Sequence, residues 1–304
     1  MADELLLEGA VEPSRNRHLF GHGEAEAYLA QSYRGGKGHH ALLLEGAAGI
    51  GKATLAFRFA NHVLHFPHPA DAPDHLIEPD QTSPLTRQII AGASHDLLHL
   101  KRPVDAKSGK LKTAITVEEV RRAGHFLSQT SGTGNWRIVI VDAADDLNRN
   151  AANAILKILE EPPKNAMFLL ISHAPGRLLP TIRSRCQRVR FGTLSRDAME
   201  TWLTRQDYSP AEQDWARRFG EGSPGRVTEA IETGLIAWHE RIGGMLERLL
   251  AGQYPLELGA SMASMVDEWA SARVAADARQ SKEAGNKAGA DRMLSLVGEI
   301  LRMK

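Results

Sequence analysis

The sequence predicts an α/β protein in which a parallel sheet, covered on both faces, is followed by an all-helical region. Short apolar runs alternate with helical patterns up to about residue 191, a glycine-rich loop follows the first run, and only helical patterns occur beyond residue 191. Apolar runs separated by helices are typical of parallel strands, because crossover helices cover both faces of such a sheet. With 304 residues, the chain has room for roughly two domains.

Five segments have the length and composition of buried strands. They are Ala41 to Leu44, Leu97 to Leu100, Ile138 to Val141, Met167 to Ile171 and a weaker alternating segment, Gln187 to Phe191. Helices are predicted between them over Ala53 to Leu64, Val117 to Leu127 and Ala151 to Leu159. Thr116 followed by Glu119 predicts a capping box, and the Pro-, Asp- and His-rich stretch 66–83 predicts a loop.

Beyond Phe191 every predicted element is a helix. Starts are predicted at Ser195, Ser209 and Pro224, and a longer helix over Ile236 to Leu250. These signals divide the chain into an α/β domain over residues 1–193, a small helical domain over 194–233 and a C-terminal helical segment over 234–304. The last segment has room for only three or four helices.

The end of the chain has two kinds of pattern. The polar stretch 277–291 is expected to be an exposed helix or a flexible connector. Apolar residues then repeat at helical spacing, which favours a core-facing helix and a subunit interface about equally. The residues of this repeat are Met293, Leu296, Val297, Ile300 and Leu301.

Charge and composition exclude several classes of protein. The 37 basic and 37 acidic residues cancel, so bulk charge does not hold this chain to nucleic acid. A single cysteine, Cys186, excludes an internal disulfide and a four-thiolate zinc site. The acidic N-terminus and the absence of a long apolar run predict a soluble, cytoplasmic protein. A local basic cluster favours a solvated loop over a DNA contact; its members are Lys101, Arg102, Lys107, Lys110 and Lys112.

The loop after the first predicted strand has the P-loop spacing. Gly46, Gly49, Gly51 and Lys52 match G-x-x-x-x-G-K between a strand and a helix. Glycines let backbone N–H groups surround phosphate oxygens, and the lysine adds a positive charge near the terminal phosphates. We therefore favour nucleotide binding over the alternative of a plain glycine-rich turn.

Other positions argue against hydrolysis at this site. The residue after Lys52, where a hydroxyl would bind Mg²⁺, is Ala53, and Thr54 lies one residue too late on the helix. Asp142 ends the third strand, as the metal-binding carboxylate of a P-loop enzyme does. It is followed by Ala143, with the next carboxylate at Asp145. The sequence therefore predicts a P-loop that lacks a complete hydrolysis apparatus.

Further motifs identify a family. The sequence NAILKILEEPP starts at Asn153, Ser184-Arg185-Cys186 follows the fourth strand, and Leu19 to His22 reads LFGH. Together with ITVEEVRR at Ile115, these motifs resemble the clamp-loader branch of the AAA+ proteins over about residues 13–233. Within this branch, an intact SRC beside degraded hydrolysis residues is similar to the delta-prime subunits of bacterial DNA polymerase III. The gamma/tau motors retain both hydrolysis motifs.

The resemblance implies an AAA+ P-loop domain with five parallel strands, a three-helix lid and a helical collar that joins five subunits in a ring. It implies that Arg185 is an arginine finger for the ATP site of a neighbouring motor, and that Arg226 is the lid arginine near the chain's own nucleotide. Ser172 and His173 occupy the sensor-1 region. ATP or ADP, with Mg²⁺ only alongside nucleotide, is the expected cofactor. The expected partners are gamma/tau, delta, the sliding clamp and, through the complex, primer-template DNA.

Alternatives and departures remain. A motor ATPase is permitted by Lys52 and Asp142 and opposed by Ala53 and Ala143, whereas a P-loop kinase is opposed by the SRC and LEEPP motifs. Where many relatives carry a four-cysteine zinc module, this chain has the 66–83 loop, so no structural zinc is expected. His62, His65 and His68 are spaced three apart, but no carboxylate or thiol completes a metal set there.

Overall fold

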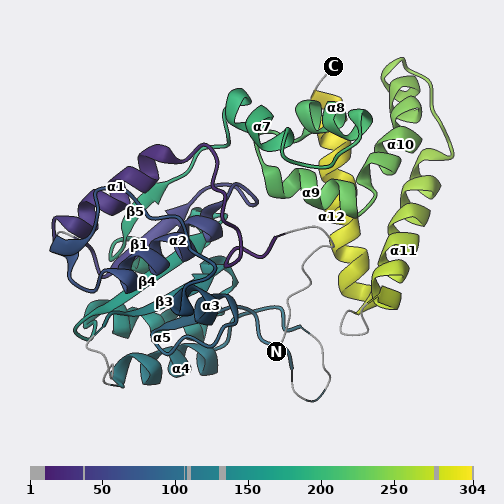
Figure 1. The fold of residues 1–304 in the computed structure, drawn as a ribbon. Coiled ribbons are helices and arrows are strands. Elements are labelled where there is room, and N and C mark those ends of the chain that lie inside the picture. The colour runs from purple at the N-terminus through teal and green to yellow at the C-terminus, as the bar shows by residue number, and fades with distance from the viewer. Residues whose placement is uncertain are drawn as a thin grey trace.

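The five predicted strands form one parallel sheet in the computed structural model, which describes residues 11–36, 38–105, 107, 111–129, 135–276 and 281–302 (Figure 1). The strand order is β2-β3-β4-β1-β5, and every neighbouring pair is parallel. The strands are β1 (Ala41–Glu45), β2 (Leu97–Leu100), β3 (Arg137–Asp142), β4 (Ala166–Ser172) and β5 (Gln187–Arg190). Because β1 lies between β4 and β5, the loop that follows it opens at the carboxyl end of the sheet, next to the edge strand β5.

Helices cover both faces of the sheet, as expected for buried parallel strands. One face packs on α1, α2 and α3, and the other on α4, α5 and α6. These helices are α1 (Gly23–Arg34), α2 (Lys52–His65), α3 (Pro84–Ile90), α4 (Val117–Ser128), α5 (Arg149–Glu160) and α6 (Pro180–Arg183). Successive residues of β4 point to opposite faces: Leu169 belongs to the first core and Phe168 to the second, both fully buried.

The predicted helical region after β5 is confirmed and lies beside the sheet domain (green to yellow in Figure 1). Its helices are α7 (Arg196–Leu203), α8 (Pro210–Phe219), α9 (Pro224–Glu232), α10 (Leu235–Leu250), α11 (Leu258–Ala276) and α12 (Lys282–Arg302). Ser195, Ser209 and Ser223 cap α7, α8 and α9 with their side chains. A third core joins α8 and α9 to α10, α11 and α12.

Most residues of the apolar repeat at the end of the chain face the protein core. Met293, Leu296 and Ile300 are buried against α10 and α11, whereas Leu301 is exposed. Part of the preceding polar stretch, 277–280, lies outside the described residues, and the remainder enters α12. Across the described ranges, no helix is both long and apolar enough to cross a bilayer.

The loop predicted over 66–83 is confirmed. It contains a short 3₁₀ turn, η1 (Pro69–Asp71), and its Leu76 is buried in the core. The capping box predicted at Thr116 is wrong, because its side chain does not cap α4. The Thr116 hydroxyl instead hydrogen-bonds the Glu118 carboxylate, which contributes most to holding the pKa of Glu118 below its usual value.

His62, on α2, lies under the loop 66–83 and is fully buried. Its ring packs on those of Tyr33 and Phe66, with centroids 6.0 and 5.3 Å away. The Ile77 backbone N–H donates to its Nδ1 over 3.4 Å, whereas the buried Nε2 has no partner among the described residues. The histidine therefore belongs to the core beneath the loop.

Candidate functional site

The loop between β1 and α2 has the backbone shape of a phosphate-binding loop. Gly49 and Gly51 adopt φ angles of 74° and 100°, a left-handed region that favours glycine. Among the described residues, none accepts a hydrogen bond from the backbone N–H groups of residues 48–51. These donors and the N-terminus of the 14-residue helix α2 form a region suited to an anion.

Lys52 is the first residue of α2, and its side chain is buried. Its Nζ donates to the Gly46 carbonyl over 2.7 Å and also to the Ala47 carbonyl. Burial lowers the pKa of Lys52 to about 8, although the carboxylates of Asp142 and Asp145 act in the opposite direction. The lysine thus turns back onto the loop and satisfies its charge on backbone oxygens.

Carboxylates from the end of β3 face this lysine. Burial by itself would raise the pKa of Asp142, but His99, His173 and Lys52 hold it below its usual value. The His99 Nε2 lies 3.9 Å from an oxygen of Asp142. Asp145 has a different role, because it accepts hydrogen bonds from the Ser172 hydroxyl and from the His173 backbone, and so connects the end of β4 to the turn after β3.

A cavity of about 570 Å³ brings most of the predicted nucleotide-site residues together. The residues that line it are Gly49, Gly51, Lys52, Thr54 and Asp142, whereas Gly46 does not line it and accepts a hydrogen bond from Lys52. Ala53 also lines this cavity, so the position next to the lysine offers no hydroxyl. The free N–H groups and the lysine fit a nucleotide's phosphates, whereas only Asp142 remains of the pair that would hold Mg²⁺.

The N-terminus of α9 packs directly on the tip of the P-loop. The Gly225 N–H donates to the Gly49 carbonyl over 2.8 Å, and the Ser223 hydroxyl donates to the Ala48 carbonyl over 2.9 Å. A Cβ on Gly225 would lie only 2.7 Å from the Gly49 Cα. The N-terminus of α9 is therefore held to the loop, and the close backbone approach between Gly49 and Gly225 requires glycine at both positions.

Replacing Gly225 with alanine is expected to lower the free energy of unfolding by about 1–3 kcal/mol, because the new methyl group meets backbone that cannot move aside. Chemical denaturation of the chain measures this. Gly243→Ala in α10 is the matched control: nothing lies within 4 Å of its added Cβ, so it is expected to stabilise the helix slightly. Equal stability of Gly225→Ala and the unchanged chain would show that the contact does not hold α9 to the P-loop.

Arg226 does not reach the cavity that holds Lys52. It lines an adjoining cavity of about 430 Å³ between the loop tip, α9 and α12, and its Nη1 lies 2.8 Å from the Glu221 carboxylate. Arg292 and Glu229 pair in the same region. Arg226 therefore shares a cavity with Gly49 of the P-loop, which lines both cavities, but not with Lys52, Thr54 or Asp142.

Arg185 lies on the turn between α6 and β5. Its side chain is half-buried, with 34 % of its surface exposed. Its Nη2 lies 2.6 Å from Oε1 of Glu160 at the end of α5, and its Nη1 donates to the Thr181 carbonyl over 3.0 Å. The next residue, Cys186, is buried, and burial raises the pKa of its thiol to about 12. A thiol in this state is packed rather than reactive.

Comparison with known proteins assigns a family to this chain. Residues 21–195, more than half of the chain, match the family model described as "DNA polymerase III, delta subunit". The chain belongs to this family. Similar curated proteins are the DNA polymerase III delta′ subunits of Pseudomonas aeruginosa (38 % identity, covering 55 % of this chain and 47 % of the relative) and Bacillus subtilis (36 %, 64 % and 53 %). The delta′ subunit of Escherichia coli is 32 % identical, over 65 % of this chain and 56 % of its own.

The aligned region spans about half the length of these curated relatives. The match to the family model, over residues 21–195, includes the sheet, the P-loop and the SRC motif, and it ends before most of the C-terminal helices. The resemblance to delta-prime subunits inferred from the motifs is confirmed, as is the α/β fold with a helical C-terminal part.

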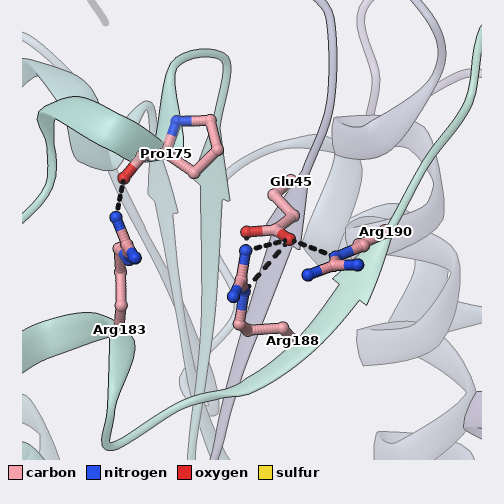
Figure 2. A network of polar contacts seen from close by, with 5 residues as sticks. All are labelled: Glu45, Pro175, Arg183, Arg188 and Arg190. Carbon is pink, nitrogen blue, oxygen red and sulfur yellow. Dashed lines mark hydrogen bonds and ion pairs between the residues drawn. The ribbon is translucent and has the colours of Figure 1, made fainter. Parts of the chain in front are cut away.

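The other arginines near the family's SRC motif have fixed structural partners (Figure 2). Glu45, at the end of β1, is buried and receives two-pronged hydrogen bonds from Arg188 and a further bond from Arg190. Burial would raise the pKa of Glu45, but these arginines hold it below its usual value. Arg183 donates to the Pro175 carbonyl over 3.4 Å. Arg188 and Arg190 therefore form an ion-pair cluster that neutralises a buried carboxylate.

Replacing Arg188 with alanine is expected to destabilise the fold by about 2–3 kcal/mol, since removing one partner leaves a buried charge poorly compensated. Arg190→Ala is expected to cost less, because its side chain is 74 % exposed while that of Arg188 is 37 % exposed. Thermal or chemical denaturation of both variants gives the order. If Arg190→Ala proves the more damaging, the bidentate contact is not the main support of Glu45.

The basic cluster around residue 101 has carboxylate partners. Arg102 lies 3.4 Å from Asp146, and Lys112 lies 3.8 Å from Asp105. Lys110 is outside the described residues. These pairs favour the solvated-loop interpretation for Arg102 and Lys112.

Several site residues were missed by sequence reasoning. His99 lies beside Asp142 because β2 and β3 are neighbours and both end at the same sheet edge. A polar residue within an apolar run was the available signal. The signals in the sequence were weaker for the contacts of Glu160 and Ser223. Glu160 pairs with Arg185, 25 residues away in the sequence, and Ser223 bonds to Ala48, 175 residues away. Such pairings become visible only in three dimensions.

Proposed function

We propose that this chain is a delta-prime subunit of a bacterial clamp loader in DNA replication. In this role it hydrolyses no ATP itself and supplies Arg185 in trans to the ATP site of a neighbouring motor subunit. The proposed assembly is a five-subunit ring with gamma/tau and delta, acting in the cytoplasm. The ring loads a sliding clamp on primer-template DNA, and any contact of this chain with DNA is to phosphates.

The observation that carries the proposal is the position of Arg185. It is partly exposed and does not line the cavity that contains Lys52 and Asp142. A guanidinium that does not serve its own site is available to one on another subunit, where it stabilises charge on the phosphoryl group being transferred. The chain's own site supports this division of labour, because Ala53 and Ala143 replace the residues that would bind Mg²⁺ and orient water.

The chain's own P-loop has a narrower role under this proposal. The N–H groups of the loop and Lys52 hold the phosphates of ATP or ADP, and Asp142 accompanies Mg²⁺ only when nucleotide is present. Lys52 must exchange its contacts with Gly46 and Ala47 for phosphate oxygens. No zinc is part of the proposal.

Reconstitution tests the proposed function. ATP turnover and clamp loading are measured with the motor and delta subunits of the same organism, clamp and primed DNA, in the presence and absence of this chain. Turnover and loading are expected only when the chain is present, whereas the purified chain alone is expected to show none. Sustained turnover by the chain alone would support a motor ATPase, and phosphoryl transfer to nucleosides or nucleotides would support a kinase.

A further inference from the structure

We infer that Glu160 is a positioning residue that holds Arg185 on its own subunit until a phosphate of a neighbouring site competes for it. The inference rests on the proposed function, because it concerns when Arg185 is free to act in trans. The observation behind it is the ion pair of 2.6 Å between the Arg185 guanidinium and the Glu160 carboxylate.

The two ends of this pair are fixed by the core beneath them. Glu160 follows Leu159, and Arg185 precedes Cys186; both apolar neighbours are buried in the core that joins α5 and α6. His40 contacts the Leu159 carbonyl over 3.1 Å and secures the end of α5. The backbone therefore brings the two charged groups together without any contribution from another subunit.

The side chains, in contrast, are open to solvent. Arg185 is 34 % exposed and Glu160 is 48 % exposed. Ion pairs of this kind contribute little net stability and exchange readily. Arg188 and Arg190 differ, because their carboxylate partner, Glu45, is only 5 % exposed and cannot be left alone at low cost. Of these three arginines, Arg185 has the partner that is easiest to leave.

The contact with the Thr181 carbonyl completes the resting position. It occupies Nη1 while Glu160 occupies Nη2, so both outer nitrogens of the guanidinium are engaged. A triphosphate offers several charged oxygens in place of one half-solvated carboxylate, and guanidinium groups bind phosphate in the same two-pronged manner. Engagement in trans therefore requires release from Glu160, and the observed rate is reduced by the fraction of molecules still held.

The test uses the complete ring with clamp and primed DNA. Glu160→Gln removes the charge while retaining an acceptor, and it is expected to raise ATP turnover by about two- to fivefold, the factor set by an exposed ion pair. Glu161→Gln is the matched control, since it neutralises the adjacent exposed carboxylate without touching the pair. It is expected to leave turnover unchanged.

A double-variant comparison separates the inference from the proposed function. In the Arg185→Ala background, Glu160→Gln is expected to have no effect, which a merely structural role would not produce. Unchanged turnover in Arg185→Ala alone would overturn the proposed function and the inference together. Suppose that Arg185→Ala lowers turnover. If Glu160→Gln then also lowers turnover, leaves it unchanged, or has the same effect in the Arg185→Ala background, Glu160 does not hold Arg185. The proposed role of Arg185 as an arginine finger would still stand. Denaturation of each variant confirms that the chain is folded.

Discussion

Replacing Arg185 with alanine is expected to lower ATP turnover at the site it completes by on the order of 10³-fold or more, the contribution of arginine fingers in other NTPases. The ring should still assemble, because the polar partners of Arg185 among the described residues are Glu160 and Thr181, both at the surface. Turnover by the reconstituted ring, with assembly checked by gel filtration, measures the effect.

Arg190→Ala is the matched control for this prediction. It removes an equally long cation from the neighbouring strand, one that is 74 % exposed and paired with Glu45. Its effect on turnover should be small. Arg185→Lys retains the charge but loses the planar two-pronged geometry, so it is expected to restore only part of the rate. Equal turnover for Arg185→Ala and Arg190→Ala would contradict a finger at residue 185.

The strands and most helix starts could be predicted because local patterns determine them. Apolar runs of strand length correspond to β1 to β5, and Ser195, Ser209 and Pro224 mark helix starts that the structure confirms. The prediction of a capping box at Thr116 was wrong because a pattern of two residues does not determine which group the hydroxyl bonds to. Here Thr116 engages Glu118.

The composition of the candidate site was also largely predictable, but its contacts were not. The spacing of Gly49, Gly51 and Lys52 is enough to form a P-loop, and the cavity contains all three. The lysine's bonds to Gly46 and Ala47, and the contact of Gly225 with Gly49, depend on where separate segments meet. The ion pair between Arg226 and Glu221 likewise could not be predicted from the sequence.

Acidification from about pH 6.5 to pH 4 is expected to lower the free energy of unfolding by roughly 3 kcal/mol through His62 alone. Burial lowers the pKa of His62 from 6.5 to about 4, with smaller contributions from His75 and His65. The unfolded chain therefore takes up a proton at His62 below pH 6.5 while the folded chain does not. Since the unfolded state binds more protons in this range, stability falls as the pH decreases.

The contribution of His62 can be isolated from that of other titrating groups by a variant. Asparagine at position 62 retains an acceptor for the Ile77 N–H but cannot be protonated. His62→Asn is expected to be less stable than the unchanged chain near pH 8, because it leaves space in the core, and to lose this disadvantage progressively toward pH 4. Urea denaturation at several pH values gives both curves.

His68→Asn is the matched control, since this histidine is exposed in the same loop. Its curve should run parallel to that of the unchanged chain, because the replacement leaves the buried His62 in place. A His62→Asn curve that also runs parallel over this range would mean that His62 is protonated in the fold. The loop 66–83 would then have to open enough to admit water to Nε2, and the core beneath it would not be the closed packing that Tyr33, Phe66 and Leu76 form.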